Sequence, residues 1–171
     1  MAKRYSNKLP MRKFFFLYII TQGLFVFSWF HRNWKHMKES GKKIRPGWRT
    51  ACLFVPFYNI WLMYAMFRDA IKMVKVKNIR TRPALNIFLL FFLAVTIDNR
   101  LGLRLPEPWD NISYVFTLLS FLPLYWTQGY LNDYWDKTKK LPLRPGFTAG
   151  QIIWITVGIL MWAIILWPLP S

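Results

Sequence analysis

Phe147–Leu169 reads FTAGQIIWITVGILMWAIILWPL and contains no Lys, Arg, Asp or Glu over its whole length. A helix of about 20 apolar residues crosses roughly 30 Å of hydrocarbon, so this run is long enough to span a bilayer. Four more runs are free of charged residues: Phe14–Phe30, Ala51–Phe67, Pro83–Ile97 and Ile112–Leu131. The sequence therefore predicts an all-α integral membrane bundle of four to five transmembrane helices, with residues 1–171 forming a single membrane domain.

The charged residues of the chain gather between these runs, and most of them are basic. Lys and Arg number 24 against 7 Asp and Glu, which gives a formal net charge of +17. Cations that flank apolar runs are typical of membrane proteins, in which they stay on the cytoplasmic side and contact anionic head groups. No motif for binding RNA or DNA accompanies the charge, so we expect no nucleic acid partner.

The distribution of the cations conflicts with five full crossings. The N-terminal arm and three connecting stretches are basic and should all lie in the cytoplasm: 31–47, 68–82 and 133–146. Two full crossings between the arm and the second of these stretches would place 31–47 outside. If Phe14–Phe30 or Ala51–Phe67 crosses only partly, the conflict disappears. We expect the partial crossing at Ala51–Phe67, where Pro56 interrupts helical hydrogen bonding, with a kinked spanning helix as the alternative.

Two parts of the chain resemble each other. A shift of 99 residues without gaps aligns Asn33, Lys38, Arg45, Pro46, Gly47 and Trp48 with Asn132, Lys137, Arg144, Pro145, Gly146 and Phe147. We interpret 14–67 and 112–169 as helix-hairpin repeats joined by a linking helix over 83–97, because membrane folds often arise from internal repeats. Chance similarity near helix ends is the alternative.

Two groups of side chains are candidates for function. Seven cations around the first basic stretch are predicted to contact anionic lipid or a partner protein: Arg32, Lys35, Lys38, Lys42, Lys43, Arg45 and Arg49. Five polar residues inside the apolar runs either line a polar cavity or bond neighbouring helices: Thr21, Gln22, Asn59, Asn86 and Gln128. His31 and His36 lack the i, i+4 spacing of a helical zinc pair. We predict no catalytic residue, no metal site and no cofactor.

Three short strings carry a resemblance to a known family. They are IITQGLF at Ile19–Phe25, WFHRNWK at Trp29–Lys35 and PGWR at Pro46–Arg49. They resemble the Thr-x-Gly-aromatic helix, the Asn-Trp-Lys element and the Pro-aromatic-Trp-Arg element of a family of small bacterial multi-pass membrane proteins of unknown function. Gly47 stands where that family usually has an aromatic residue. The resemblance implies a location in the bacterial cytoplasmic (inner) membrane and implies no activity.

Two functions follow as hypotheses from these patterns. The first is a non-enzymatic membrane component whose basic cytoplasmic loops bind anionic membrane lipids, a second copy of the chain or another membrane protein. The second is a small transporter or channel built from inverted repeats around Gln22 and Gln128. A lipid-modifying enzyme ranks third, because no set of catalytic side chains is recognisable.

Overall fold

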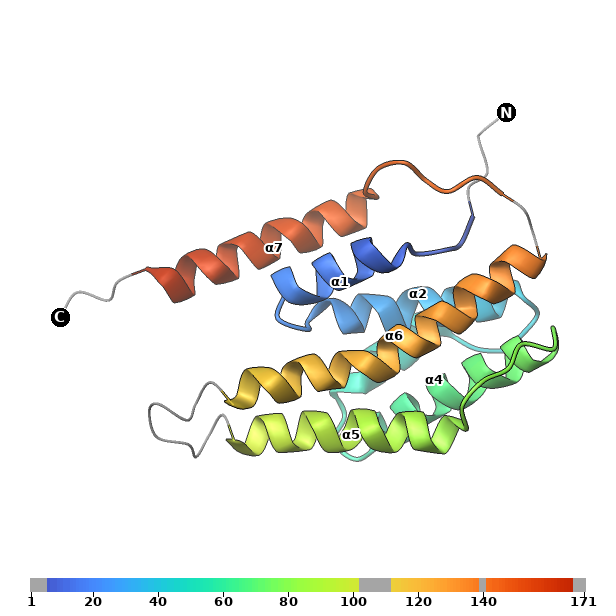
Figure 1. Cartoon of the computed structure of the whole chain (residues 1–171), viewed down its shortest axis with the longest axis horizontal. Coiled ribbons are helices and arrows are strands. Elements are labelled where there is room, and N and C mark those ends of the chain that lie inside the picture. Colours follow the sequence, from blue (N-terminus) through green and yellow to red (C-terminus); the bar gives the residue numbers. More distant parts are fainter. Residues whose placement is uncertain (1–5, 102–111, 139–140, 168–171) are drawn as a thin grey trace.

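The computed structural model describes residues 6–101, 112–138 and 141–167, and within these ranges the chain forms helices and no strands. The elements follow in the order α1 Met11–Ile20, α2 Phe25–Glu39, α3 Pro46–Ala51, the 3₁₀ turn η1 Cys52–Phe54, α4 Tyr58–Lys75, α5 Ala84–Leu101, α6 Ile112–Thr138 and α7 Ala149–Leu166. The expected all-α class is confirmed. In Figure 1, α5 and α6 lie side by side, α1 and α2 form a hairpin beside α6, and α7 lies outside against α1.

Of the helices in the described ranges, α7 alone is both long and apolar enough to cross a membrane. Ala84–Asp98, within α5, is a shorter apolar helix. Most of the α7 surface is exposed, and apolar side chains such as Ile153 and Ile164 are 63% and 76% accessible. The structure therefore matches the expected helical content, while one helix rather than four or five meets the length and composition of a span.

The first apolar run, Phe14–Phe30, is not one continuous helix. A turn over residues 21–24 separates α1 from α2, with Gln22 and Gly23 at φ of 49° and 86°. The hydroxyl of Thr21 donates to the Leu17 carbonyl (2.7 Å) and accepts from the Phe25 N–H (3.0 Å). One side chain thus bonds a carbonyl near the end of α1 and the first N–H of α2, which stabilises a sharp hairpin here.

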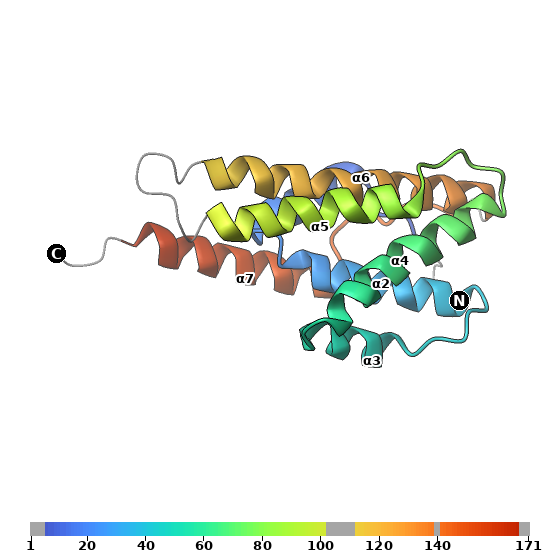
Figure 2. The same cartoon turned by 90° about the horizontal axis from the view of Figure 1, so that it is seen from below.

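The second apolar run is also interrupted, at the place where Pro56 predicted a break. The chain leaves η1 at Val55, and Phe57 has a φ of 62°, in the left-handed region that residues other than glycine rarely adopt. Helix α4 begins directly afterwards at Tyr58. Residues 46–75 therefore form a second hairpin, with the short α3–η1 arm beside α4 (Figure 2).

The hairpins bring the basic stretches to one end of the molecule. The segment before α1 and the connections α2–α3, α4–α5 and α6–α7 all lie toward the right of Figure 1, whereas the turn at 21–24 and the end of α7 lie toward the left. Figure 2 places the turn at 55–57 well short of the far end of α7. We call the right-hand part, with residues 6–13, 31–49, 68–83 and 132–148, the basic end.

The core between the hairpins and α6 consists largely of aromatic rings. Trp29 and Trp34 of α2 are fully buried, as are Phe14 of α1 and Phe67 of α4. The Phe14 and Trp29 rings stack with centroids 5.7 Å apart. This packing fixes the position of α2, which carries the residues of the candidate site on its neighbouring face.

The two stretches aligned by the 99-residue shift differ in their helix breaks. The first contains the interruptions at 21–24 and 55–57, whereas α6 runs unbroken from Ile112 to Thr138 despite Pro123. Asn33 and Asn132, which the shift pairs, also bond differently: Asn33 donates to the Trp29 carbonyl of its own helix (2.9 Å), and Asn132 bonds the segment before α1.

Candidate functional site

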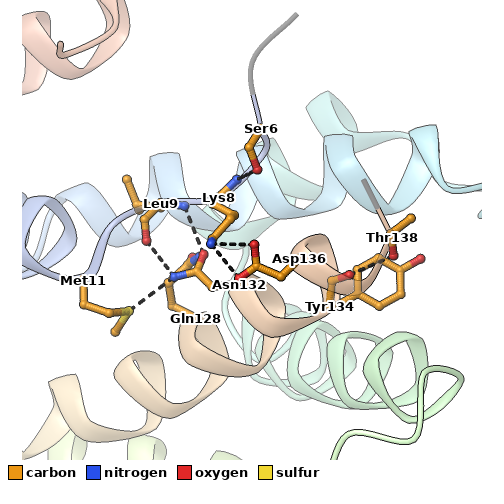
Figure 3. Close-up of polar contacts among 9 residues, drawn as sticks. All are labelled: Ser6, Lys8, Leu9, Met11, Gln128, Asn132, Tyr134, Asp136 and Thr138. Carbon is orange, nitrogen blue, oxygen red and sulfur yellow. Dashed lines mark hydrogen bonds and ion pairs between the residues drawn. The ribbon is translucent and has the colours of Figure 1, made fainter. Parts of the chain in front are cut away.

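The extended segment before α1 is attached to the C-terminal half of α6. The Asn132 side chain accepts from the Leu9 N–H (3.1 Å) and donates to the Leu9 carbonyl (2.9 Å), as Figure 3 shows. Gln128 donates to the same Asn132 oxygen (2.7 Å), and the Trp29 indole N–H donates to the Gln128 oxygen (2.7 Å). This network positions the segment beside α2, where it forms one wall of a cavity.

Arg32 of α2 crosses from the helix to this segment. Its Nη2 donates to the carbonyls of Asn7 (2.7 Å) and Lys8 (3.2 Å), and its Nε donates to Nε2 of His36 (3.2 Å). Burial, and then the nearby cation of Arg144, lower the pKa of Arg32 to about 10. Its hydrogen-bond partners are neutral, so within the described chain this guanidinium has no carboxylate to balance its charge.

His36 stands between Arg32 and Glu39 in a defined tautomer. Because its Nε2 accepts from Arg32, its Nδ1 carries the proton and donates to Glu39 Oε2 (3.2 Å). Burial and the neighbouring Arg32 cation lower the pKa of His36 below its ordinary value. The imidazole is therefore neutral at pH 7 and adds no further positive charge.

A half-enclosed cavity of about 410 Å³ lies between the N-terminal segment, α2 and the start of α7. Phe25 and Ser28 of α2 line it, as do Gly146 and Thr148 before α7 and Gly150 in its first turn. No Asp or Glu is among the described residues that line it. We call it the basic pocket, after its five cations: Lys8, Lys13, Arg32, Lys35 and Arg144.

Lys8 and Lys13 connect the pocket to other parts of the chain. Lys8 forms an ion pair with Asp136 at 2.6 Å (Figure 3). Lys13 Nζ donates to three consecutive carbonyls, of residues 144, 145 and 146, at 2.9–3.2 Å. Lys13 thereby attaches the connection before α7 to α1, although carbonyl oxygens do not cancel its charge.

Helix α7 directs its N-terminus to the same cavity. Thr148 accepts from the Gln151 N–H (3.2 Å) while Gln151 accepts from the Thr148 N–H (2.9 Å), a complete capping box. Ala149 and Gly150 lie between these two residues, and their N–H groups have no intrahelical partner. The helix dipole adds partial positive charge at this end of the helix.

A second cluster of cations surrounds the buried Asp69 of α4. Lys42, Arg49 and Arg68 lie 2.6, 3.4 and 3.6 Å from its carboxylate oxygens. Arg49 also lies over the Trp34 ring, 5.9 Å from its centroid. Asp69 is the anion that these three cations share. Through it, the α2–α3 connection and helix α3 are both attached to α4.

The structure divides the seven predicted cations into three groups. Arg32 and Lys35 line the basic pocket, and Lys42 and Arg49 bind Asp69. The side chains of the remaining three, Lys38, Lys43 and Arg45, are exposed at the basic end.

Sequence reasoning did not assign Lys8, Lys13 and Arg144 to the same site. Each belongs to a basic stretch that is visible in the sequence. Nothing local to those stretches brings them together, because the attachment of Leu9 to Asn132 joins positions 123 residues apart.

The five polar residues of the apolar runs do not form one cavity wall. Thr21 caps the first hairpin and Gln128 belongs to the network on α6, whereas Gln22 is exposed in the turn. Asn59 is partly buried in the first turn of α4, and Asn86 is exposed on α5. Thr21 and Gln128 thus form hydrogen bonds that hold neighbouring segments together. This agrees with the second interpretation of the polar residues, bonding between helices, and not with a shared polar cavity.

Within the described ranges, no three His, Cys, Asp or Glu side chains are grouped so that they could hold a metal ion. Comparisons of the chain with protein-family models, curated proteins and solved structures found no match.

Proposed function

We propose that this chain is a multi-pass protein of the bacterial cytoplasmic membrane, without catalytic activity, that binds anionic lipid head groups through its basic end. The observation that carries the proposal is the convergence of four basic stretches at one end of a helical bundle. A membrane protein retains such stretches on the cytoplasmic side, where anionic lipids attract them.

The helix lengths support three crossings and two partial ones. At 1.5 Å per residue, α5 and α7 are each about 27 Å long and α6 about 40 Å, comparable with roughly 30 Å of hydrocarbon. Helix α1 is about 15 Å long and would reach only half that depth. Helix α4 is as long as α5 and α7, but its second half carries Arg68, Lys72 and Lys75, which leaves only its first ten residues for the hydrocarbon. With α1–α2 and α3–α4 as hairpins that enter and leave on the same side, the N-terminal arm and 31–47 both lie in the cytoplasm, and the charge conflict disappears.

The turn at the tip of the first hairpin is compatible with a water-free environment. The N–H groups of residues 21–24 donate to the carbonyls of Leu17, Ile19, Tyr18 and Thr21, at 2.8–3.3 Å. Irregular backbone at membrane depth requires such internal bonding. Exposed apolar side chains at both tips, such as Leu24 and Phe57, also suit contact with lipid.

Cysteine labelling tests the membrane placement. In a Cys52→Ala background, single cysteines at Ser40 and Thr138, both exposed at the basic end, should resist an impermeant thiol reagent in intact cells until lysis. A cysteine at Trp167, 73% exposed after α7, should label without lysis. Labelling at Ser40 but not at Thr138 would instead indicate five full crossings and would favour inverted repeats.

Lipid titration of the purified protein in neutral detergent tests the binding. Each cation near an anionic surface contributes about 1 kcal/mol, so the triple variant Lys38→Gln, Lys43→Gln, Arg45→Gln should lose about 3 kcal/mol of its preference for phosphatidylglycerol over phosphatidylcholine. Its control exchanges Lys and Arg at the same three positions and keeps the charge. An unchanged preference in the Gln variant would contradict lipid binding through these loops.

A further inference from the structure

We infer that an open groove between α4 and the start of α5 holds one anionic phospholipid, with an acyl chain in the groove and the phosphate on Arg68. The inference rests on the proposed function, because it assigns one lipid molecule to a defined place beside the basic end. It goes beyond the attraction of lipids by exposed loops, since an apolar groove and a cation here recognise the two parts of the same molecule.

The groove presents an apolar surface to the surroundings of the protein. Its volume is about 400 Å³, and its lining consists of aliphatic and aromatic residues from the two helices and the turn before α4: Phe57, Ile60, Trp61, Tyr64, Leu85 and Phe88. Phe57, Trp61 and Leu85 are 86%, 46% and 52% exposed. Exposed apolar area of this kind is unfavourable in water and marks a contact with a membrane or another apolar partner.

The groove lies at the depth of the hydrocarbon in the proposed orientation. Helix α4 runs from the turn at 55–57 toward the basic end (Figure 2). Its first charged residue is Arg68, after ten uncharged residues. At 1.5 Å per residue, Arg68 lies about 6 Å beyond Tyr64 toward the cytoplasmic face. A lipid with its acyl chain in the groove therefore has its head group at the level of Arg68.

Arg68 has donors available for a phosphate. Its guanidinium lies over the Tyr64 ring, 5.8 Å from the centroid, and this ring packs against Phe88 in the groove. Asp69 lies 3.6 Å away, too far to accept a hydrogen bond from Arg68. Within the described ranges Arg68 Nε has no hydrogen-bond partner, and the side chain as a whole is 38% exposed. A guanidinium held in this way is suited to the oxygens of a phosphate.

The charges around Arg68 favour an anionic head group. Asp69 is shared by Lys42, Arg49 and Arg68, so this cluster has two positive charges in excess among the described residues. Lys42 is the closest of the three, at 2.6 Å from an Asp69 oxygen. A phosphate on Arg68 lowers the excess without separating Asp69 from Lys42, whereas a zwitterionic head group brings a further cation to the cluster.

The same charges disfavour a second copy of the chain as the occupant of the groove. Two copies that met through this surface would place their Asp69 clusters, each with its excess of cations, near one another. The chain as a whole carries a formal net charge of +17 and only 7 Asp and Glu, so it has few acidic groups with which to neutralise Arg68. Repulsion between like charges opposes such an association.

Photocrosslinking of the full chain in phosphatidylcholine vesicles tests the inference. The probes are phosphatidylglycerol and phosphatidylcholine with a diazirine in the acyl chain, and mass spectrometry maps the adducts. We expect phosphatidylglycerol to label Trp61 and Leu85 at least about five-fold more than phosphatidylcholine, the factor that one cation near an anionic lipid supplies. Ile153 and Ile164, exposed on α7, are the internal reference for bulk lipid and should react equally with both probes.

Two variants separate the cation from the groove. Arg68→Gln should remove the excess of phosphatidylglycerol adducts in the groove, because the head group loses its charge-assisted contact, and should leave the α7 adducts unchanged. Its control, Lys77→Gln, removes the same charge from an exposed position at the basic end outside the groove and should keep the excess. Leu85→Trp keeps every charge but fills part of the groove, so it should also reduce the excess.

Equal labelling of the groove by the two probes, or an excess that survives Arg68→Gln, would overturn the inference. A groove without adducts from either probe would indicate that another protein surface covers it and would overturn the inference as well. The lipid titration of the loop variant tests the proposed function separately. If the wild-type protein showed no preference for phosphatidylglycerol in that titration, the proposed function itself would fail.

Discussion

Replacing Asn132 with leucine is expected to lower the free energy of unfolding by about 3 kcal/mol, because each buried polar group left unpaired costs about 1–3 kcal/mol. The substitution removes both partners of the Leu9 main chain, whose residue is 1% exposed, and one partner of the Gln128 amide. Unfolding followed by helical circular dichroism in mixed micelles of rising sodium dodecyl sulfate content would measure the change.

Asn86→Leu is the matched control for this variant. Asn86 also lies on a long helix, but its side chain is exposed and has no hydrogen bond to a described residue. We expect its free energy of unfolding to lie within about 0.5 kcal/mol of the wild-type value, as is usual for surface substitutions. If the two variants were equally stable, the attachment of the N-terminal segment to α6 would not contribute to the fold.

Replacing Gly158 with alanine is expected to destabilise the contact between α7 and α1 by about 2 kcal/mol, within the range found for overpacked sites. A Cβ at this position would lie 2.8 Å from the carbonyl carbon of Ile20, and closer still to its oxygen. Backbone atoms at the end of α1 cannot rotate away as a side chain could, so α7 must move outward. The same unfolding titration would detect the loss.

Gly129→Ala makes the same chemical change on α6, where a Cβ would meet nothing within 4 Å. Alanine favours a helix over glycine by about 1 kcal/mol, so this control should be neutral or slightly stabilising. Changes of opposite sign in the free energy of unfolding would distinguish close packing at Gly158 from a general effect of alanine on helices. Equal effects would contradict the packing of α7 on α1.

Much of the helical architecture could be predicted from the sequence. Uncharged runs at 83–97, 112–131 and 147–169 correspond to α5, α6 and α7, with α6 continuing to Thr138. Pro56 marked the interruption of the second run, because its ring removes a helical hydrogen bond whatever surrounds it. These features depend on the chemistry of neighbouring residues in the chain, so they can be predicted from the sequence.

The turn in the first run could have been inferred from Thr21, Gln22 and Gly23, because polar residues followed by a glycine in an apolar run are typical of a turn. Apolar periodicity does not distinguish a continuous helix from two helices joined by a short turn. The basic stretch after it, 31–47, was the stronger sign, because it required one early run to turn back.

The sequence by itself determined that the chain is helical, that its charge lies between apolar runs and that those charges are predominantly basic. Only the tertiary structure decided which cations meet. Lys8, Arg32 and Arg144 come from three distant stretches and converge because Asn132 holds Leu9 and because α7 packs on α1 through Gly158. Charge is a property of each residue, whereas a pocket depends on long-range contacts whose geometry no local pattern encodes.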